Sequence, residues 1–274
     1  MFLSKAKEVS ARIDEDLAQL LELKKTIAKE HNYDVPIVGI VTQVDELSPK
    51  SVDKPPFDNE AKQKNISEAM DVLSEKLNSI ISSPVKVIPI CCYIEFEGEE
   101  IVYDIRWNVD KLIEYLIDKL PNEAQLIFAK LTKVKNAQKK VARKIGASVA
   151  GITGLIGANP IPIADLPVIT GLQTTMIISI ALIGGNKVDK KGVGEFLGAL
   201  GVNVAAGFAL REAARQLVKL IPVAGGAVSG AVAAAGTYAL CESAIAYFID
   251  KEPIKVVKEN YRKNLEKDEN EEVN

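Results

Sequence analysis

The sequence has few of the residues on which disulfide frameworks and histidine chemistry depend. Its three cysteines are Cys91, Cys92 and Cys241, and adjacent cysteines seldom pair with each other. A disulfide framework is therefore disfavoured, and we expect a reducing, cytosolic compartment. His31 is the only histidine. Because it lies in a polar stretch at an expected helix end, we expect it to be solvated and not part of a catalytic triad.

The sequence also lacks the parts that hold a nucleoside triphosphate. A phosphate-binding loop requires Gly-x-x-x-x-Gly-Lys-Ser/Thr after a strand, and no Gly-Lys pair occurs in the chain. No strand carries a convincing magnesium-binding Asp, and phosphoryl transfer depends on such groups. We therefore expect no catalytic residues and no metal ligands in this chain. No apolar stretch follows Met1, so the start does not resemble a signal peptide.

The first 120 residues alternate between helical and strand-like patterns. Helical spacing of apolar residues predicts helices over 1–34 and 65–81 and from Asn108 onward, and buried strands are predicted at 37–41 and 85–90. The proline-bearing stretch 46–60 is expected to be a loop. This alternation predicts an α/β layer with a parallel sheet. Two strands are too few to complete such a sheet, so this part is expected to be incomplete.

The remaining residues are expected to be entirely helical, which makes the fold class α/β followed by all-α. We expect four parts: 1–120, a basic linker helix at 121–145, a hydrophobic helical domain at 146–250 and a charged tail at 251–274. Within the hydrophobic part, helices are predicted at 145–158, 161–185, 192–210 and 217–249. Seven cations precede the hydrophobic part: Lys130, Lys133, Lys135, Lys139, Lys140, Arg143 and Lys144.

Two interpretations of the hydrophobic part compete. In the first, its helices form a soluble bundle in which small residues allow close packing. In the second, some of them insert in or lie on a membrane, and 168–185 approaches the roughly 20 apolar residues that a span requires. The cations suit an anionic membrane surface and the cytoplasmic side. Interior helical glycines also weaken a soluble bundle. We therefore favour peripheral or hairpin-like membrane association on the cytoplasmic face, and no nucleic-acid partner.

Polar residues follow both predicted strands of the first part. Thr42-Gln43-Val44-Asp45 follows one strand and Pro89-Ile90-Cys91-Cys92 ends the other. Ligands of open α/β sheets bind beyond the carboxyl ends of the strands. A carboxylate there can accept both the ring N–H and the amino group of guanine, and adenine lacks this donor pair. The alternative is that Asp45 is an ordinary loop carboxylate.

Thr42-Gln43-Val44-Asp45 resembles the Asn-Lys-x-Asp base-recognition motif of the Era-like GTPases, with Thr for Asn and Gln for Lys. The run ending in Cys91-Cys92 resembles the Ser-Ala-Lys loop, with Cys92 at the Ala position. This resemblance implies that Asp45 selects guanine, that Gln43 lays its stem on the base, and that the Cys92 N–H faces the guanine oxygen. The literal Asn-Lys-Val-Asp at 186–189 is rejected, because no strand with a small-residue loop follows it.

Longer segments resemble a bacterial GTPase subgroup with a C-terminal GTPase-associated domain of unknown function. They lie at 11–17, 45–49, 102–108, 161–167 and 195–201, so the resemblance covers nearly the whole chain up to Ile249. It implies a truncated G domain of the P-loop NTPase type that lacks its N-terminal half. A complete member would bind GTP or GDP with Mg²⁺. The chain is then a fragment or half of a split protein.

The resemblance implies a guanine-nucleotide-dependent regulator that acts at a membrane. The family hydrolyses GTP, but we expect this chain alone to bind guanine nucleotide weakly or not at all, and the sequence leaves open whether it is an enzyme. The alternative is a non-enzymatic, membrane-associated scaffold or adaptor, in which the α/β part is a folded adaptor.

Overall fold

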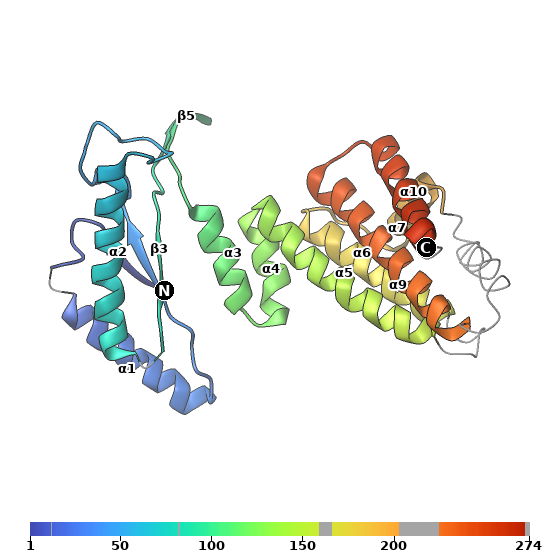
Figure 1. Ribbon diagram of the computed structural model, residues 1–274, viewed down its shortest axis with the longest axis horizontal. Coiled ribbons are helices and arrows are strands. Elements are labelled where there is room, and N and C mark those ends of the chain that lie inside the picture. The colour runs from blue at the N-terminus through green and yellow to red at the C-terminus, as the bar shows by residue number, and fades with distance from the viewer. Residues whose placement is uncertain (12, 82, 159–165, 203–224, 272–274) are drawn as a thin grey trace. The chain divides into compact units, whose positions relative to one another are not determined.

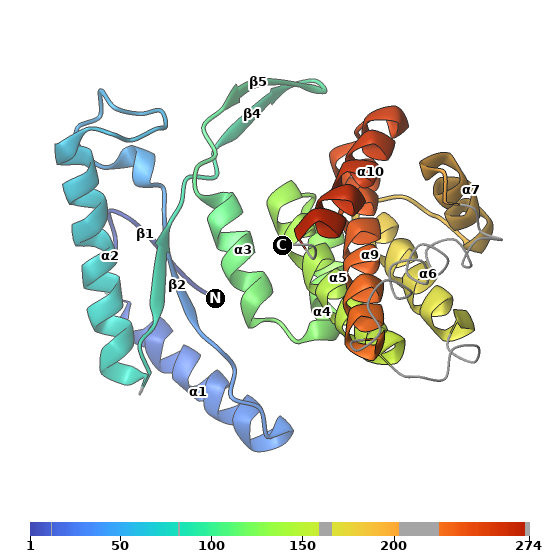
Figure 2. The ribbon, with the colours of Figure 1, turned by 45° about the vertical axis from the view of Figure 1, so that its right-hand side comes forward.

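The computed structural model describes residues 1–11, 13–81, 83–158, 166–202 and 225–271. The chain divides into two compact units, Met1–Lys119 and Leu120–Asn274. The first is an α/β layer with a small parallel sheet and the second is helical (Figures 1 and 2). The expected fold class is therefore confirmed at this coarse level.

The parallel sheet of the first unit has three strands in the order β1-β2-β3. They are β1 (Phe2–Lys5), β2 (Val38–Thr42) and β3 (Lys86–Pro89). The predicted strands are confirmed, but the helix predicted over 1–34 is wrong, because its first residues form β1. In β1 burial alternates with period two, so Phe2 and Ser4 are buried while Leu3 is exposed. Four residues are too few for that period to stand out in the sequence.

Helices cover both faces of this sheet. One face packs into a core that includes Leu17 of α1 (Asp14–His31) and Leu73 of α2 (Glu60–Ile80). On the other face, Ile40 and Ile88 pack with Leu112 of α3 (Val109–Lys119). Because β2 is buried on both sides, its sequence is continuously apolar, as is usual for parallel strands.

The first unit also contains two short elements that the sequence patterns did not predict. A 3-10 turn, η1 (Val44–Glu46), follows β2 directly. The strands β4 (Ile94–Glu97) and β5 (Glu100–Asp104) form an antiparallel hairpin whose turn contains Gly98 at φ 63°. Much of this hairpin is exposed on both faces, so it shows little of the alternation of a half-buried strand.

The second unit is a bundle whose described elements run from Asn122 to Glu271. They are α4 (Asn122–Thr132), α5 (Lys135–Gly157), α6 (Leu166–Ile183), α7 (Lys190–Leu200), α9 (Gly225–Ile245), the π-helical turn η3 (Ala246–Asp250) and α10 (Ile254–Glu271). The single basic linker helix predicted over 121–145 is wrong. Lys133 adopts a left-handed conformation at φ 54° and ends α4, and α5 continues far into the hydrophobic part.

Gly146 and Gly154 of α5 and Gly230 of α9 allow these two antiparallel helices to pack closely. A Cβ on Gly146 would lie 2.2 Å from the Cys241 Sγ, and one on Gly230 would lie 2.7 Å from the Gly154 carbonyl oxygen. Between these contacts the hydroxyls of Thr153 and Thr237 are hydrogen-bonded at 2.9 Å. The glycines that weaken each helix alone therefore permit the contact that holds the pair together.

One helical stretch among the described residues, Gly230–Asp250, is long and apolar enough to cross a membrane by length and composition. Of the most apolar 18 residues of this stretch, 56% are buried inside the protein, and core helices of soluble proteins meet the same criteria of length and composition. The stretch 168–185 lies mostly in α6, which ends at Ile183, is shorter and is largely buried in its second half. The predicted helices at 161–185, 192–210 and 217–249 lie partly outside the described residues.

The charged tail predicted at 251–274 is helical over most of its described part. It forms α10, whose Val257 and Tyr261 are buried against the bundle. Burial raises the pKa of Tyr261 to about 12, and its hydroxyl has no hydrogen-bond partner among the described residues. The two buried positions are four residues apart, so they lie on one face of α10.

Candidate functional site

The carboxyl ends of β2 and β3 bring together the two segments that the sequence singled out. The strands are adjacent and parallel, with Val41 opposite Pro89, and the Ile90 N–H donates to the Val41 carbonyl at 2.8 Å. Asp45 follows β2 in the turn η1, and Cys91 and Cys92 follow β3. The sheet therefore places both segments at one edge, where ligands of open α/β sheets bind.

The four residues after β2 differ in exposure. Thr42 is half-buried and its hydroxyl donates to the Ser4 carbonyl at 3.4 Å, so it connects the ends of two strands. Gln43 is exposed and adopts a left-handed conformation at φ 56°. Val44 is fully buried and anchors the turn, which leaves Asp45 half-buried beside the end of the sheet.

The Asp45 carboxylate lies against the thiol of Cys91. Burial is the largest cause that raises the pKa of Cys91 to about 12, and a hydrogen bond to Asp45 and the charge of Asp45 contribute to the same shift. The backbone of Cys91 pairs with Trp107, with the Cys91 N–H donating at 3.2 Å and its carbonyl accepting at 2.9 Å. A thiol is a weak donor, so Asp45 keeps most of its capacity to accept stronger N–H donors.

Cys92 differs from its neighbour. Its side chain is exposed, and its backbone N–H has no hydrogen-bond partner among the described residues. An N–H in that state can donate to an oxygen of a ligand at the sheet edge. Asp45 and Cys92 thus supply an acceptor and a donor, from two adjacent strand ends.

Lys62, at the start of α2, is a component of this site that the sequence analysis missed. Its side chain is fully buried, and its ammonium donates to the carbonyls of Asp45 and Leu47, each at 2.6 Å. The ammonium also lies 5.3 Å from the centre of the Phe57 ring. Burial lowers the pKa of Lys62, and the negative charge of Asp45 opposes that shift. Lys62 therefore fixes the backbone of the turn that presents Asp45.

A signal for Lys62 was present in the sequence. Asn59 caps α2 by accepting the Lys62 N–H at 3.1 Å, so the helix begins five residues before the predicted Asn65. Lys62 then lies one turn before Ile66, on the face that continues through Ala69 and Leu73. A lysine at a core position of a helix is costly unless its ammonium group finds buried hydrogen-bond acceptors, and here the acceptors are two backbone carbonyls.

The rejected motif at 186–189 has structural roles. The Asn186 amide donates to the Phe248 carbonyl at 3.1 Å, and Asp189 caps α7 by accepting the Gly192 N–H at 2.9 Å. His31 is exposed at the end of α1, as expected. Over the described ranges, no group of three or more histidine, cysteine, aspartate or glutamate side chains is arranged to hold a metal ion.

Five of the seven cations predicted to face lipid divide between internal contacts and exposure. Lys139 pairs with Asp250 at 2.8 Å, and Arg143 forms two bonds with Glu242 at 2.8 and 3.1 Å. Lys144 donates to side-chain oxygens of α4. Lys133 and Lys135 are exposed between α4 and α5. Part of the basic segment therefore holds the bundle together, which reduces the charge available to a membrane.

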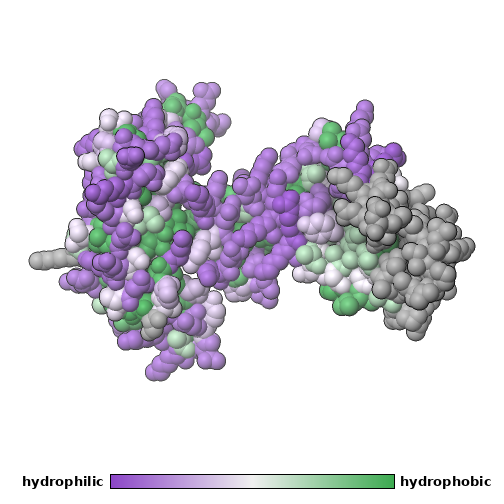
Figure 3. Space-filling view, in the orientation of Figure 1, coloured by the Kyte–Doolittle hydropathy of each residue, from purple (hydrophilic) through white to green (hydrophobic). Residues whose placement is uncertain are grey.

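Exposed apolar side chains lie toward the other end of α5. Leu155 is 79% exposed and Ile152 is 46% exposed. Figure 3 shows hydrophobic residues gathered at the lower edge of the helical unit, over the end of α5 as it is drawn in Figure 1. Cations and exposed apolar groups therefore occupy opposite ends of this helix.

Comparisons of the chain with models of protein families, with curated proteins and with solved structures found no match.

Proposed function

We propose that the protein is a guanine-nucleotide-dependent regulator that acts at a membrane surface. In this proposal the first unit supplies the base-recognition side of a P-loop NTPase-type G domain, and the helical unit carries the output. The observation that carries the proposal is the position of Asp45 and Cys92 at the carboxyl ends of adjacent parallel strands. That is where a sheet of this kind binds nucleotides.

The chemistry of guanine fits the donors and acceptors at this edge. The Asp45 carboxylate accepts the ring N–H and the exocyclic amino group, and these displace the weaker Cys91 thiol. The Cys92 N–H donates to the guanine oxygen, and the exposed stem of Gln43 covers one face of the base. Adenine has no matching donor pair and would leave the carboxylate unpaired, which disfavours it.

Base recognition alone gives weak binding. The sequence has no phosphate-binding loop, so the contacts that dominate nucleotide affinity in such domains are missing from this chain. We therefore assign GTP hydrolysis to none of its residues. A partner or segment that supplies a phosphate loop and Mg²⁺ would complete the reaction site.

The test compares nucleosides, because they carry the base without the phosphates. In NMR titrations, guanosine should shift the amide signals of Asp45 and Cys92, and adenosine should not. Asp45→Asn should weaken guanosine binding at least about tenfold. The same variant should gain xanthosine binding, because xanthine carries an oxygen where guanine has the amino group and the new amide can donate to it.

Asp53→Asn is the matched control, since Asp53 is an exposed carboxylate of the following loop. It should leave both nucleosides unaffected. Equal shifts with guanosine and adenosine, or an Asp45→Asn variant that binds guanosine like the unmodified protein, would show that Asp45 does not read the base. The scaffold alternative would then hold if the protein still bound lipid.

A further inference from the structure

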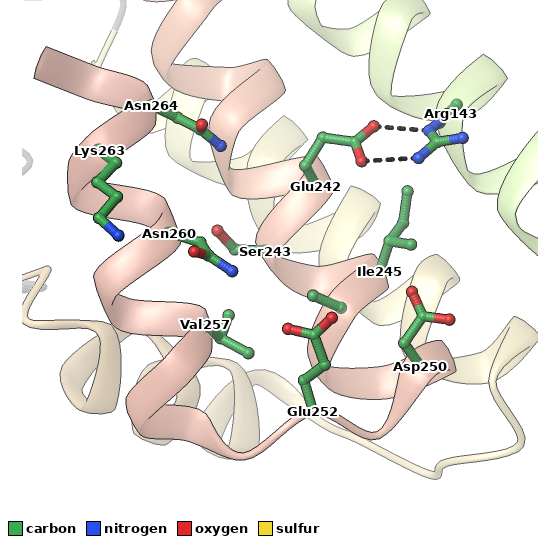
Figure 4. A pocket seen from close by; sticks show the side chains of 11 residues that line it. Arg143, Glu242, Ser243, Ile245, Asp250, Glu252, Val257, Asn260, Lys263 and Asn264 are labelled. Atoms are coloured by element: carbon green, nitrogen blue, oxygen red, sulfur yellow. Dashed lines mark hydrogen bonds and ion pairs between the residues drawn. The ribbon is translucent and has the colours of Figure 1, made fainter. Parts of the chain in front are cut away.

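The second unit contains an open cavity of about 600 Å³ that the nucleotide proposal does not use. It lies between the end of α9, the π-helical turn η3 and α10, and reaches Arg143 of α5 (Figure 4). This volume is within the usual range of small-molecule sites. Unlike most such sites, it is lined largely by charged and amide side chains, so its occupant is expected to be polar.

Some of the charges around the cavity are neutralised within the protein. Arg143 pairs with Glu242 through two bonds, and Asp250 pairs with Lys139. Ser243 donates its hydroxyl to the Ala239 carbonyl at 2.8 Å. The charges and hydrogen-bonding groups of these residues are satisfied within the protein, so they do not require a ligand.

Glu252 has an unsatisfied oxygen at the bottom of the cavity. Its Oε2 is buried and has no hydrogen-bond partner among the described residues. Figure 4 shows its carboxylate pointing into the space between η3 and α10. A buried carboxylate oxygen without a donor is costly, so this position favours a bound group that donates hydrogen bonds and carries positive charge.

The backbone around η3 fixes this orientation. The wider π turn ends at Lys251, which is left-handed at φ 63°, and the Glu252 N–H donates back to the Ala246 carbonyl at 3.0 Å. Turns of this type often occur at functional sites. The chain therefore reverses at a point that places the carboxylate of Glu252 inward.

One face of α10 supplies hydrogen-bond donors and a positive charge, in contrast to the acidic Glu252. Asn260, Lys263 and Asn264 line the cavity at positions three and four residues apart, so they share a helix face. All three side chains are exposed, and within the part of the chain that the structure describes no hydrogen bond or ion pair involves them. An ammonium group flanked by two amides suits an anionic, oxygen-rich group.

We propose that this cavity binds a small polar molecule that carries an ammonium group against Glu252 and an acidic group against Lys263, Asn260 and Asn264. The same chemistry occurs in free phosphoethanolamine and in the headgroup of phosphatidylethanolamine. The site is independent of nucleotide recognition, since all its residues belong to the second unit.

Calorimetric titration with phosphoethanolamine tests the site. We expect binding, and we expect inorganic phosphate or ethylamine alone to bind at least about tenfold more weakly, because joined groups bind cooperatively. Glu252→Gln and Lys263→Met should each weaken phosphoethanolamine binding roughly tenfold or more. Lys255→Met, on an exposed part of α10 away from the cavity, should have no effect.

Denaturation midpoints of all variants establish that each is folded. Vesicles that contain phosphatidylethanolamine distinguish the two sources. If they compete with the soluble probe, the lipid headgroup is the ligand, and if they do not, it is a free molecule. The proposal is overturned if phosphoethanolamine does not bind, if phosphate alone binds equally well, or if the folded Glu252 and Lys263 variants bind like the unmodified protein.

Discussion

At the scale of single residues, the buried ammonium of Lys62 is the unexpected part of the first unit. Placing a lysine in a core is costly unless its donors are used. Here two of them reach the carbonyls of Asp45 and Leu47. The same contacts determine the backbone conformation from which the Asp45 carboxylate projects, so the stability of the unit and the geometry of the candidate site depend on one side chain.

We therefore expect Lys62→Met to destabilise the protein by about 2 kcal/mol, because the methionine stem fills the space but leaves two carbonyls without donors. Urea denaturation followed by circular dichroism measures this loss. Guanosine binding should weaken in the same variant, since the turn that carries Asp45 loosens.

Lys64→Met is the control for this substitution. Lys64 is exposed on the same helix, where its pair with Glu68 at 3.8 Å is solvated and its loss should change the stability by less than about 0.5 kcal/mol. A Lys62→Met protein as stable as the Lys64→Met protein would mean that the buried ammonium does not hold the turn.

At the scale of elements, close packing of α5 against α9 explains the glycines at positions 146, 154 and 230. We expect Gly146→Ala to destabilise the protein by about 1–3 kcal/mol, because the new methyl group meets Cys241 and forces α5 and α9 apart. Thermal denaturation measures the change.

Gly151 offers a control on the same helix, since a Cβ there meets nothing within 4 Å. Gly151→Ala should stabilise the protein by roughly 0.5–1 kcal/mol through helix propensity alone. If both variants shifted the stability in the same direction and by the same amount, helix propensity would account for both effects. The contact between α5 and α9 would then not explain the effect of Gly146→Ala.

The elements also show what the sequence could predict. The largely apolar β2 and β3 were predictable, because parallel strands are mostly buried on both faces. The edge strand β1 was not, since its four residues continue into a longer stretch with helical spacing. The break at Lys133 was missed for a related reason: a lysine gives no glycine-like signal for a left-handed residue. Placing Asp45 and Cys92 together required only strand order, whereas finding Lys62 required the correct start of α2.

At the scale of the whole molecule, membrane attachment is the property that the second unit must supply if the proposed function holds. Ile152 and Leu155 are exposed toward one end of α5, while Lys133 and Lys135 lie at the other. About 30 Å of helix separates these ends, at 1.5 Å per residue. Contact with lipid through both ends requires α5 to lie nearly parallel to the membrane.

Flotation with vesicles of anionic lipid checks this arrangement. We expect the protein to float, to float less at high salt because the charge contribution is screened, and to lose flotation in the variant Ile152→Glu/Leu155→Glu. Leu23→Glu, at a 57% exposed position of α1, should float normally. If the unmodified protein did not float with vesicles of any composition, the soluble-bundle interpretation of the helical unit would hold. The membrane would then be removed from the proposed function.

The π-helical turn after α9 has a consequence for how the chain tolerates change. A turn of this kind is equivalent to an α-helix that has gained a single residue. Deleting one position within Ala246–Asp250 would therefore restore regular winding and rotate everything downstream by about 100°, since each α-helical residue advances by that angle. Glu252 would swing out toward water, and α10 would lose the surface that buries Val257 and Tyr261. A substitution at the exposed Tyr247 should consequently be far milder than any change in the length of this turn.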